Sequence, residues 1–190
     1  MQLTASHWRN FRSSVDYWSS VLFIKFWWYI TAATDYCRRA KVPVIFTQHG
    51  YRDLPKESGM LGQWWDDPIV VGTEKWKRIS EIAPNREEKI IRKRRYSTFY
   101  GTDLDGILKI LGVKDVIIVG VMTNLCCETT ARDAFVRDYR VFFLVDGTAT
   151  VSEDYHLTTL KNLVYGVAYL KQCDDIITEL SPFSQGRCFL

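Results

Sequence analysis

Short apolar runs recur along most of this chain and are typical of buried strands. Residues 42–47 read VPVIFT, residues 116–121 read VIIVGV and residues 141–145 read VFFLV. Runs of this length, rich in β-branched residues, are expected of parallel strands that are covered on both faces. Residues 89–92 are a fourth strand candidate. The pattern therefore predicts four strands spread over the chain.

Between these runs the spacing of apolar residues changes to three and four, which predicts helices. The helices are expected at residues 31–40, 103–111 and 125–137, with Gly112 placed as the C-cap of the second. Ser152 is placed to cap a last helix. Its inner face is expected to carry Leu157, Leu160, Val164 and Val167.

Alternating strands and helices predict an α/β fold with a three-layer, mostly parallel, doubly wound (Rossmann-like) sheet. Such a sheet places its functional sites at the carboxyl ends of its strands. The length of 190 residues fits one domain. Residues 1–30 fit the pattern poorly, with residues 21–26 as the best candidate for a first strand. We therefore expect an atypical segment at 1–30, the domain at 31–190, and an irregular cover at 50–84.

Composition narrows the possible partners and the compartment. The net charge of +3 is too small to predict a nucleic-acid partner. The longest apolar run, residues 21–30, has about half the length of a membrane span and contains a lysine. Five cysteines, an odd number, and the absence of a signal-peptide pattern favour reduced thiols and a cytoplasmic location. Three histidines make a histidine-rich metal site difficult to build.

Cys126 stands where the 116–121 strand gives way to a helix. A thiol at a helix N-terminus meets the positive end of the helix dipole and free amide groups, which favour the thiolate and can bind an oxyanion. The alternative is that a cysteine here is only a small buried residue. Cys127 points about a hundred degrees away on the same helix, so only one of the two can face the strand ends. We expect Cys127 to pack in the core.

The stretch around Cys126 resembles the isochorismatase-like cysteine hydrolases, and within them the plant nicotinamidase branch. The family carries a G-V-x-T-x-x-C turn followed by a T-A-x-x-A helix. The matching residues are Gly120, Val121, Thr123, Cys126, Thr130, Ala131 and Ala134. The resemblance implies that Cys126 is the nucleophile and that a cis peptide joins Val121 to Met122. It also implies an oxyanion hole formed by the amides of Met122 and Cys126.

A second family block is a lysine at a strand end followed by an aromatic residue, a small residue and a phenylalanine. Residues 93–99 read KRRYSTF, so the resemblance places the catalytic lysine at Lys93. An ammonium close to Cys126 would favour the thiolate. The alternative for residues 92–95 is a solvated basic patch or a nucleic-acid contact.

The third family block, an aspartate followed by a glutamine as D-x-Q, is not found. Asp16 has no apolar strand before it, and Asp35 falls inside a predicted helix. The metal-binding D-x-H of some nicotinamidases reads His49-Gly50-Tyr51 here, which leaves too few ligands for a metal. No metal or other cofactor is therefore expected.

The substrate pocket is expected to include His49, Trp64, Trp65 and Tyr96. An aromatic side chain from the 50–84 cover could stack on a pyridine ring. The alternatives are an ordinary surface histidine and tryptophans that pin the loop to the domain.

The resemblance implies an amidohydrolase that converts nicotinamide to nicotinic acid and ammonia through a cysteine thioester. Without the aspartate, we expect slower turnover than in relatives with all three groups. The alternative is an inactive relative that binds a ligand or partner through the same pocket. A small amide is the expected partner, without nucleic acid or membrane, and relatives of this kind often form homo-oligomers.

Overall fold

In the computed structural model, residues 17–77, 82–179 and 187–189 of the chain are described. Helices and strands alternate along most of them. In chain order the elements are α2 (Tyr17–Arg39), β1 (Ile45–His49), α3 (Leu54–Glu57), α4 (Gly59–Trp64), the 3-10 turn η1 (Glu74–Trp76), β2 (Lys89–Lys93), α5 (Leu104–Ile110), β3 (Asp115–Val121), the π-helical turn η3 (Thr123–Cys127), α6 (Glu128–Phe135), β4 (Arg140–Ala149), α7 (Glu153–Gly166), β5 (Tyr169–Lys171), α8 (Cys173–Glu179) and β6 (Arg187–Phe189).

All of these strands pair in parallel, but they form two sheets. β1 pairs with β2, and a separate sheet has the order β5-β4-β3-β6. The predicted α/β class with a mostly parallel arrangement is confirmed, and the four predicted strands are found as β1, β2, β3 and β4. One continuous sheet is not observed, because no pairing between described strands joins β1 to β3. The short β6 lies along the first part of β3 instead.

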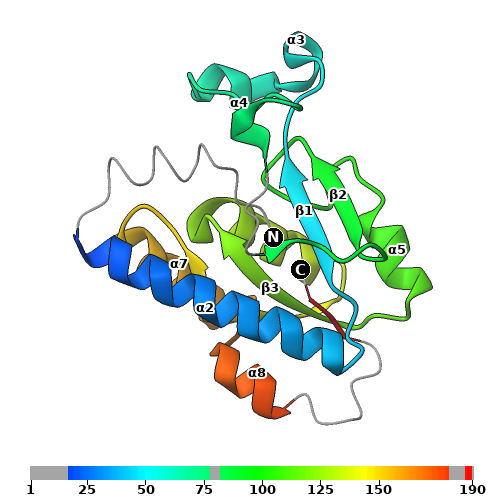
Figure 1. Cartoon of the computed structure of the whole chain (residues 1–190), viewed down its shortest axis with the longest axis vertical. Helices are drawn as coiled ribbons and strands as arrows, with labels where there is room; N and C mark the ends of the chain where they lie inside the picture. The colour runs from blue at the N-terminus through cyan, green and yellow to red at the C-terminus, as the bar shows by residue number, and fades with distance from the viewer. Residues whose placement is uncertain (1–16, 78–81, 180–186, 190) are drawn as a thin grey trace.

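Helices cover both faces of the strands, as the three-layer expectation requires. On one face, α2 packs against β4 and α8, and one core cluster lies beneath it. On the other face, α5, α6 and α7 enclose a second cluster that also takes in residues of β1, β2 and β3. Figure 1 shows α2 and α8 on the viewer's side of β3. The helices α3 and α4 lie beyond the carboxyl ends of β1 and β2.

The strand expected at residues 21–26 is wrong, because this segment belongs to the 23-residue helix α2. Phe26, Ile30, Ala33 and Cys37 are all buried in the core, at helical spacings of four, three and four. The row of buried residues on α2 thus continues through residue 30 without a break. Neither glycine nor proline occurs between residues 17 and 39, so the helix predicted at 31–40 starts much earlier.

Among the described residues, no helix has the length and apolar character needed to cross a membrane.

The inner face predicted for the last long helix is only half right: Leu160 and Val167 pack in or against the second core cluster, whereas Leu157 and Val164 do not. Ser152 caps α7 as expected, since its side chain accepts a hydrogen bond from the amide of Tyr155. Leu160 is buried as predicted, but Leu163 takes the second core position and Val164 is exposed. Leu157 is exposed as well. The apolar residues of α7 cover more than one face, so periodicity alone could not identify the buried one.

Ile30 tests whether α2 is part of the core. Replacing this fully buried residue by alanine (Ile30→Ala) should lower the free energy of unfolding by about 2–5 kcal/mol, because it leaves a cavity. Trp28→Ala is the matched control, since Trp28 is 65% exposed on the same helix and should change the free energy by less than about 1 kcal/mol. Urea unfolding followed by circular dichroism measures both. Equal small effects would show that α2 does not pack as described.

Candidate active site

The central contact joins the ends of two strands from different sheets. Lys93 is the last residue of β2, and Cys126 lies in η3 directly after β3. The Nζ atom of Lys93 lies 3.0 Å from the Sγ atom of Cys126. The sequence predicted this proximity, and the structure confirms it. The contact lies at the carboxyl ends of parallel strands, where α/β folds usually place their sites.

The ammonium of Lys93 has a hydrogen-bond acceptor for each of its three N–H groups. The residue is 1% exposed, and its ammonium also donates to the carbonyl oxygens of Arg95 and Tyr96, both at 3.0 Å. No carboxylate of the described residues is hydrogen-bonded to it. An ammonium buried without a negative partner is costly. The sulfur of Cys126, as a thiolate, would supply that negative charge.

The two adjacent cysteines have different environments. Cys127 is buried in the core beneath α6, and burial raises the pKa of its thiol. Cys126 is partly exposed and holds the contact with Lys93. The turn η3 runs directly into α6, so Cys126 lies in the first turn of a continuous helical segment. Of the two thiols, Cys126 is therefore the one available to a ligand.

The turn that carries Cys126 has the backbone implied by the resemblance. The peptide between Val121 and Met122 is cis. The carbonyl oxygen of Met122 accepts hydrogen bonds from the amides of Leu125 and Cys127, at 3.1 and 3.2 Å. Met122 thereby fixes the chain on both sides of Cys126.

Two further hydrogen bonds anchor this turn to the neighbouring elements. The hydroxyl of Thr123 lies 3.0 Å from the Nδ1 atom of His156 on α7, and Thr150 donates to the side chain of Asn124 at 2.6 Å. Burial lowers the pKa of His156, so the ring is neutral near pH 7. Sequence analysis had no signal for His156, because its partner lies 33 positions away.

The cover formed by α3 and α4 is attached to the same strand that carries Lys93. Arg92 forms a bidentate ion pair with Glu57 of α3, at 2.9 and 3.0 Å, and Arg95 donates to the carbonyl oxygen of Glu57 at 2.7 Å. The hydrogen bonds from Arg92 are the main reason that the pKa of Glu57 falls to about 2. Sequence analysis missed Glu57, since a single glutamate in a polar segment carries no recognisable pattern.

His49 lies beside Lys93, and it brings Tyr51 to the site. In the β1–β2 register His49 is the partner of Lys93, and its ring meets the ring of Tyr51 edge-on at 4.9 Å. Tyr51 is only 2% exposed. Burial raises the pKa of its hydroxyl, the charge of Arg95 opposes this, and the charge of Cys126 adds to it. Tyr51 was considered in the sequence only as a missing metal ligand, so its place at the site was missed.

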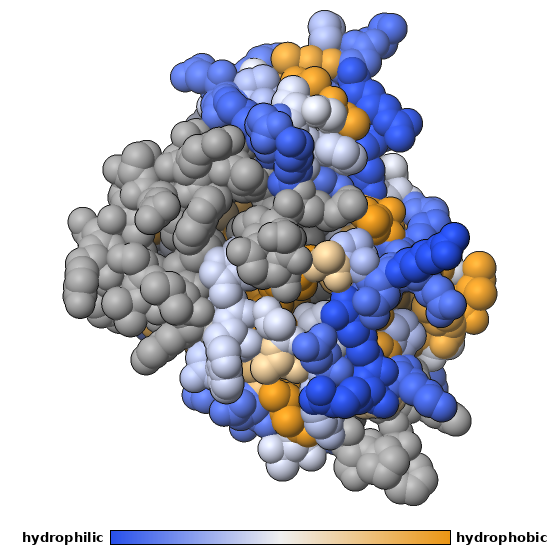
Figure 2. Space-filling model, in the orientation of Figure 1, coloured by the Kyte–Doolittle hydropathy of each residue, from blue (hydrophilic) through white to orange (hydrophobic). Residues whose placement is uncertain are grey.

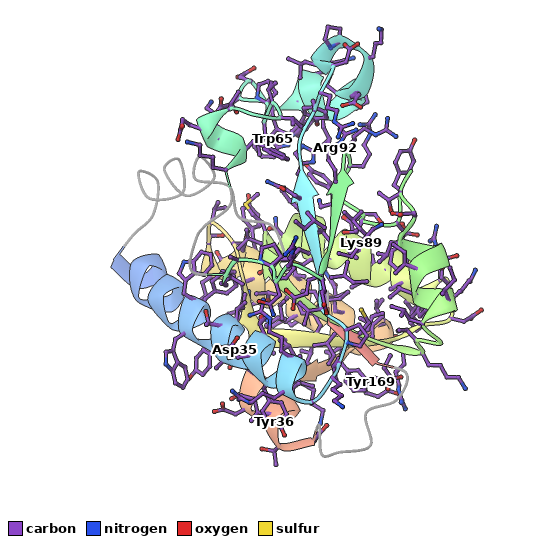
Figure 3. All side chains as sticks on the ribbon, turned by 45° about the vertical axis from the view of Figure 1, so that its right-hand side comes forward. Asp35, Tyr36, Trp65, Lys89, Arg92 and Tyr169 are labelled. Carbon is purple, nitrogen blue, oxygen red and sulfur yellow. The ribbon has the colours of Figure 1, made fainter. Side chains whose placement is uncertain are left out.

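The structure separates the two predicted tryptophans. The indole Nε1 of Trp65 donates to the hydroxyl of Tyr96 at 2.9 Å, whereas the side chain of Trp64 is 74% exposed. Figure 3 labels Trp65 and Arg92 in the part of the molecule that carries α3 and α4. In Figure 2, apolar and charged residues lie side by side on the surface of this lobe. Trp65 is thus linked to the segment that follows Lys93, whereas Trp64 points to solvent, and a substrate pocket that includes them stays a prediction.

Of the two carboxylates that were considered for the third family block, Asp35 is not at the site. Asp35 forms an ion pair with Arg38 at 3.0 Å on α2, and Figure 3 shows it well away from Trp65 and Arg92. Asp16 lies outside the described residues. Within the described part of the chain, no group of three or more histidine, cysteine, aspartate or glutamate side chains could hold a metal ion.

Comparison with known proteins gives a consistent result at the level of sequence. A model of the isochorismatase domain matches residues 26–175. Nicotinamidase 3 of Arabidopsis thaliana is 47% identical over 150 residues, which cover 77% of this chain and 75% of that protein. Enterobactin synthase component B of Escherichia coli K12 is 33% identical over 132 residues, covering 70% of this chain and 46% of that longer protein.

Solved structures agree at the level of the fold. A cysteine hydrolase from Pseudomonas syringae pv. phaseolicola 1448A has a TM-score of 0.80 and 26% identity, with 83% of this chain and 80% of that chain covered. A pyrazinamidase/nicotinamidase from Streptococcus mutans UA159 has a TM-score of 0.68 and 25% identity, with coverages of 75% and 82%.

The difference between the two cysteines can be measured by alkylation. Iodoacetamide at neutral pH should label Cys126 quickly and Cys127 only on unfolding, because Cys127 is buried and the thiolate is the reactive species. Mass spectrometry of the peptide that contains both residues should show one label, which Cys126→Ser removes and Cys127→Ser retains. The opposite pattern would mean that the two thiols have exchanged roles.

Proposed function

The chain belongs to the isochorismatase family and is a nicotinamidase-like hydrolase, and on this premise we propose that it deamidates nicotinamide through a thioester on Cys126. The observation that carries the proposal is the 3.0 Å contact between Lys93 and Cys126 at the strand ends. An inactive, ligand-binding relative is not favoured, because this contact between a nucleophile and a cation is intact.

In the first step the thiolate of Cys126 attacks the carboxamide carbon, and the carbonyl oxygen becomes an oxyanion. We assign the oxyanion hole to the amides of Met122 and Cys126, which lie in the turn that Met122 fixes by its two hydrogen bonds. The C–N bond then breaks. The leaving nitrogen needs one proton to depart as ammonia.

Lys93 is the group that we assign to deliver this proton. Its ammonium already contacts the reacting sulfur, so an amide carbon bonded to that sulfur brings the leaving nitrogen close to Nζ. Loss of the proton leaves a neutral amine beside a neutral thioester. In the second step the amine takes a proton from water as the water attacks the thioester, which releases nicotinic acid and restores both the thiolate and the ammonium. The proton balance closes without a carboxylate.

We also propose a cytoplasmic location and no nucleic-acid partner. All five cysteines are free thiols, which is typical of a reducing compartment. Arg92 and Arg95 donate to Glu57 and to backbone carbonyls. The basic run at residues 92–95 is therefore occupied largely by contacts within the protein.

A homo-oligomer is the assembly that we propose. The outer face of α7 exposes Leu157, Val164 and Tyr165, and Lys161 lies within the same stripe. The adjacent strand β5 adds the exposed Tyr169. Exposed apolar side chains that gather on one face often mark a protein interface. A second copy of the chain would bury this face symmetrically.

Ammonia release from nicotinamide tests the proposed chemistry. Cys126→Ala should abolish it, and Lys93→Met should lower the rate by about 10²–10⁴-fold, because the proton transfer is lost. Asp16→Asn is the discriminating variant, and its rate should stay within about threefold of the original. If Asp16→Asn is as inactive as Cys126→Ala, Lys93 is not the sole proton carrier. Circular dichroism controls for folding.

Light scattering after gel filtration tests the assembly. Val164→Glu places a charge on the exposed face of α7 and should convert a dimer to a monomer, because an unpaired charge in an interface is unfavourable. Ile110→Glu is the control, since Ile110 is 87% exposed on α5 and should leave the mass unchanged. A monomeric original protein at about 100 µM would contradict the proposal, since stable dimers usually have dissociation constants well below this.

A further inference from the structure

Tyr96 is held at both ends by parts of the site. Its carbonyl oxygen accepts a hydrogen bond from the ammonium of Lys93 at 3.0 Å. Its hydroxyl oxygen accepts the indole N–H of Trp65 at 2.9 Å. Trp65 directly follows α4, where its own amide donates to Leu61. The tyrosine therefore connects the buried ammonium to the cover and has a fixed position relative to both.

The hydrogen bond with Trp65 determines whether the hydroxyl of Tyr96 is still able to donate a hydrogen bond. An indole nitrogen can only donate, so Tyr96 is the acceptor in this pair. The phenolic proton must then point elsewhere. No described residue accepts it in any hydrogen bond of the structure. Burial and the charge of Cys126 raise the pKa of Tyr96, although the bond from Trp65 opposes this, so the hydroxyl keeps its proton near neutral pH.

The backbone of Tyr96 also lies close to the reacting sulfur. A single ammonium, Lys93, links the backbone of Tyr96 to the Sγ atom of Cys126 through two contacts of 3.0 Å. The ring is half-buried, so a ligand can reach it. The other phenol whose pKa is raised by the charge of Cys126, Tyr51, is 2% exposed and is closed to a ligand. Of the two phenols, Tyr96 alone combines access with an unused donor.

We propose that Tyr96 determines specificity in this site by donating its hydroxyl proton to an acceptor atom on the ring of the substrate. This inference rests on the proposed amidase function and names the preferred class of substrate: heteroaromatic carboxamides with a ring nitrogen in place to accept. In nicotinamide the ring nitrogen is meta to the carboxamide. With the carboxamide carbon at Cys126, the nitrogen lies within a few ångströms of that carbon, and the inference places it against the hydroxyl of Tyr96.

The consequence is a preference for nicotinamide over benzamide, which has the same shape but no ring nitrogen. A site built around a donor disfavours a ligand that leaves the donor unpaired. We expect kcat/KM for nicotinamide to exceed that for benzamide by about 10- to 100-fold, the usual range for one neutral hydrogen bond plus its desolvation. The bond forms equally in the ground state and the transition state, so the difference should appear in KM rather than kcat.

The test compares the two amides on the intact chain. Tyr96→Phe should bring the nicotinamide-to-benzamide ratio of kcat/KM close to one. Trp65→Phe, which keeps an aromatic ring but loses the N–H, should lower the ratio in the same direction. Tyr100→Phe is the matched control: Tyr100 is an exposed tyrosine four positions away, and the ratio should not change. A Tyr96→Phe ratio equal to that of the original protein would overturn the inference, as would an equal loss for both amides.

Binding keeps this test separate from the proposed function. The Cys126→Ala protein cannot form a thioester, so titration of it with nicotinamide and benzamide, followed by tryptophan fluorescence, measures recognition alone. Tighter binding of nicotinamide that Tyr96→Phe removes supports the inference even if no turnover is found. Failure of nicotinamide to bind better than benzamide overturns it.

A last measurement needs no variant of Tyr96 and so is independent of its folding. The isomers with the ring nitrogen ortho or para to the carboxamide should bind to the Cys126→Ala protein at least about tenfold more weakly than nicotinamide. Equal binding of the three isomers would contradict a fixed donor.

Discussion

The buried ammonium of Lys93 is the constraint on which the arrangement of the site depends. A charged residue that is 1% exposed must find its hydrogen bonds inside the protein, and it finds them in two backbone carbonyls and one sulfur. The two carbonyls force residues 93–96 to curl around Nζ, directly after β2. The sulfur requires the turn after β3 to approach from the other side. The positions of both loops therefore follow from one side chain.

The same contact bridges a break in the strand arrangement. Lys93 belongs to the β1–β2 pair and Cys126 follows a strand of the larger sheet, and no described pairing joins the two. Other links cross the same boundary, since the amide of Thr98 donates to the hydroxyl of Thr130, and the second core cluster includes residues of both sheets. Side-chain packing and a few polar contacts thus hold the two sheets together, whereas in a continuous sheet backbone hydrogen bonds between neighbouring strands would do so. The chemistry at Cys126 depends on this boundary remaining closed.

Much of this could be predicted from the sequence, because local patterns determined it. The β-branched run of β3 and the turn that leads to Cys126 are adjacent in the chain, and Lys93 is identified by the residues that follow it. Glu57, Tyr51 and His156 could not be predicted in the same way. Their roles come from contacts with residues far along the chain, and glutamate, tyrosine and histidine are ordinary residues in their own segments. The first strand was wrongly assigned because a run such as VLFIKFWWYI suits either a strand or a helix, and only its burial pattern decides.

The basic run at residues 92–95 shows how adjacent like charges can be accommodated. Successive side chains of a strand point to opposite sides. Lys93 turns inward to the sulfur, and Arg92 turns to Glu57 on the cover. Arg95 then donates to the carbonyl of that same glutamate residue, so the cover is tied to the segment that encloses the ammonium. A movement of the cover would therefore pull on the residues around Lys93.

Tyr96 completes this link, because its hydroxyl contacts Trp65 and its carbonyl contacts Lys93. The position of the cover and the placement of the reactive pair are thus coupled through consecutive hydrogen-bonding residues of the chain, from Lys93 to Tyr96.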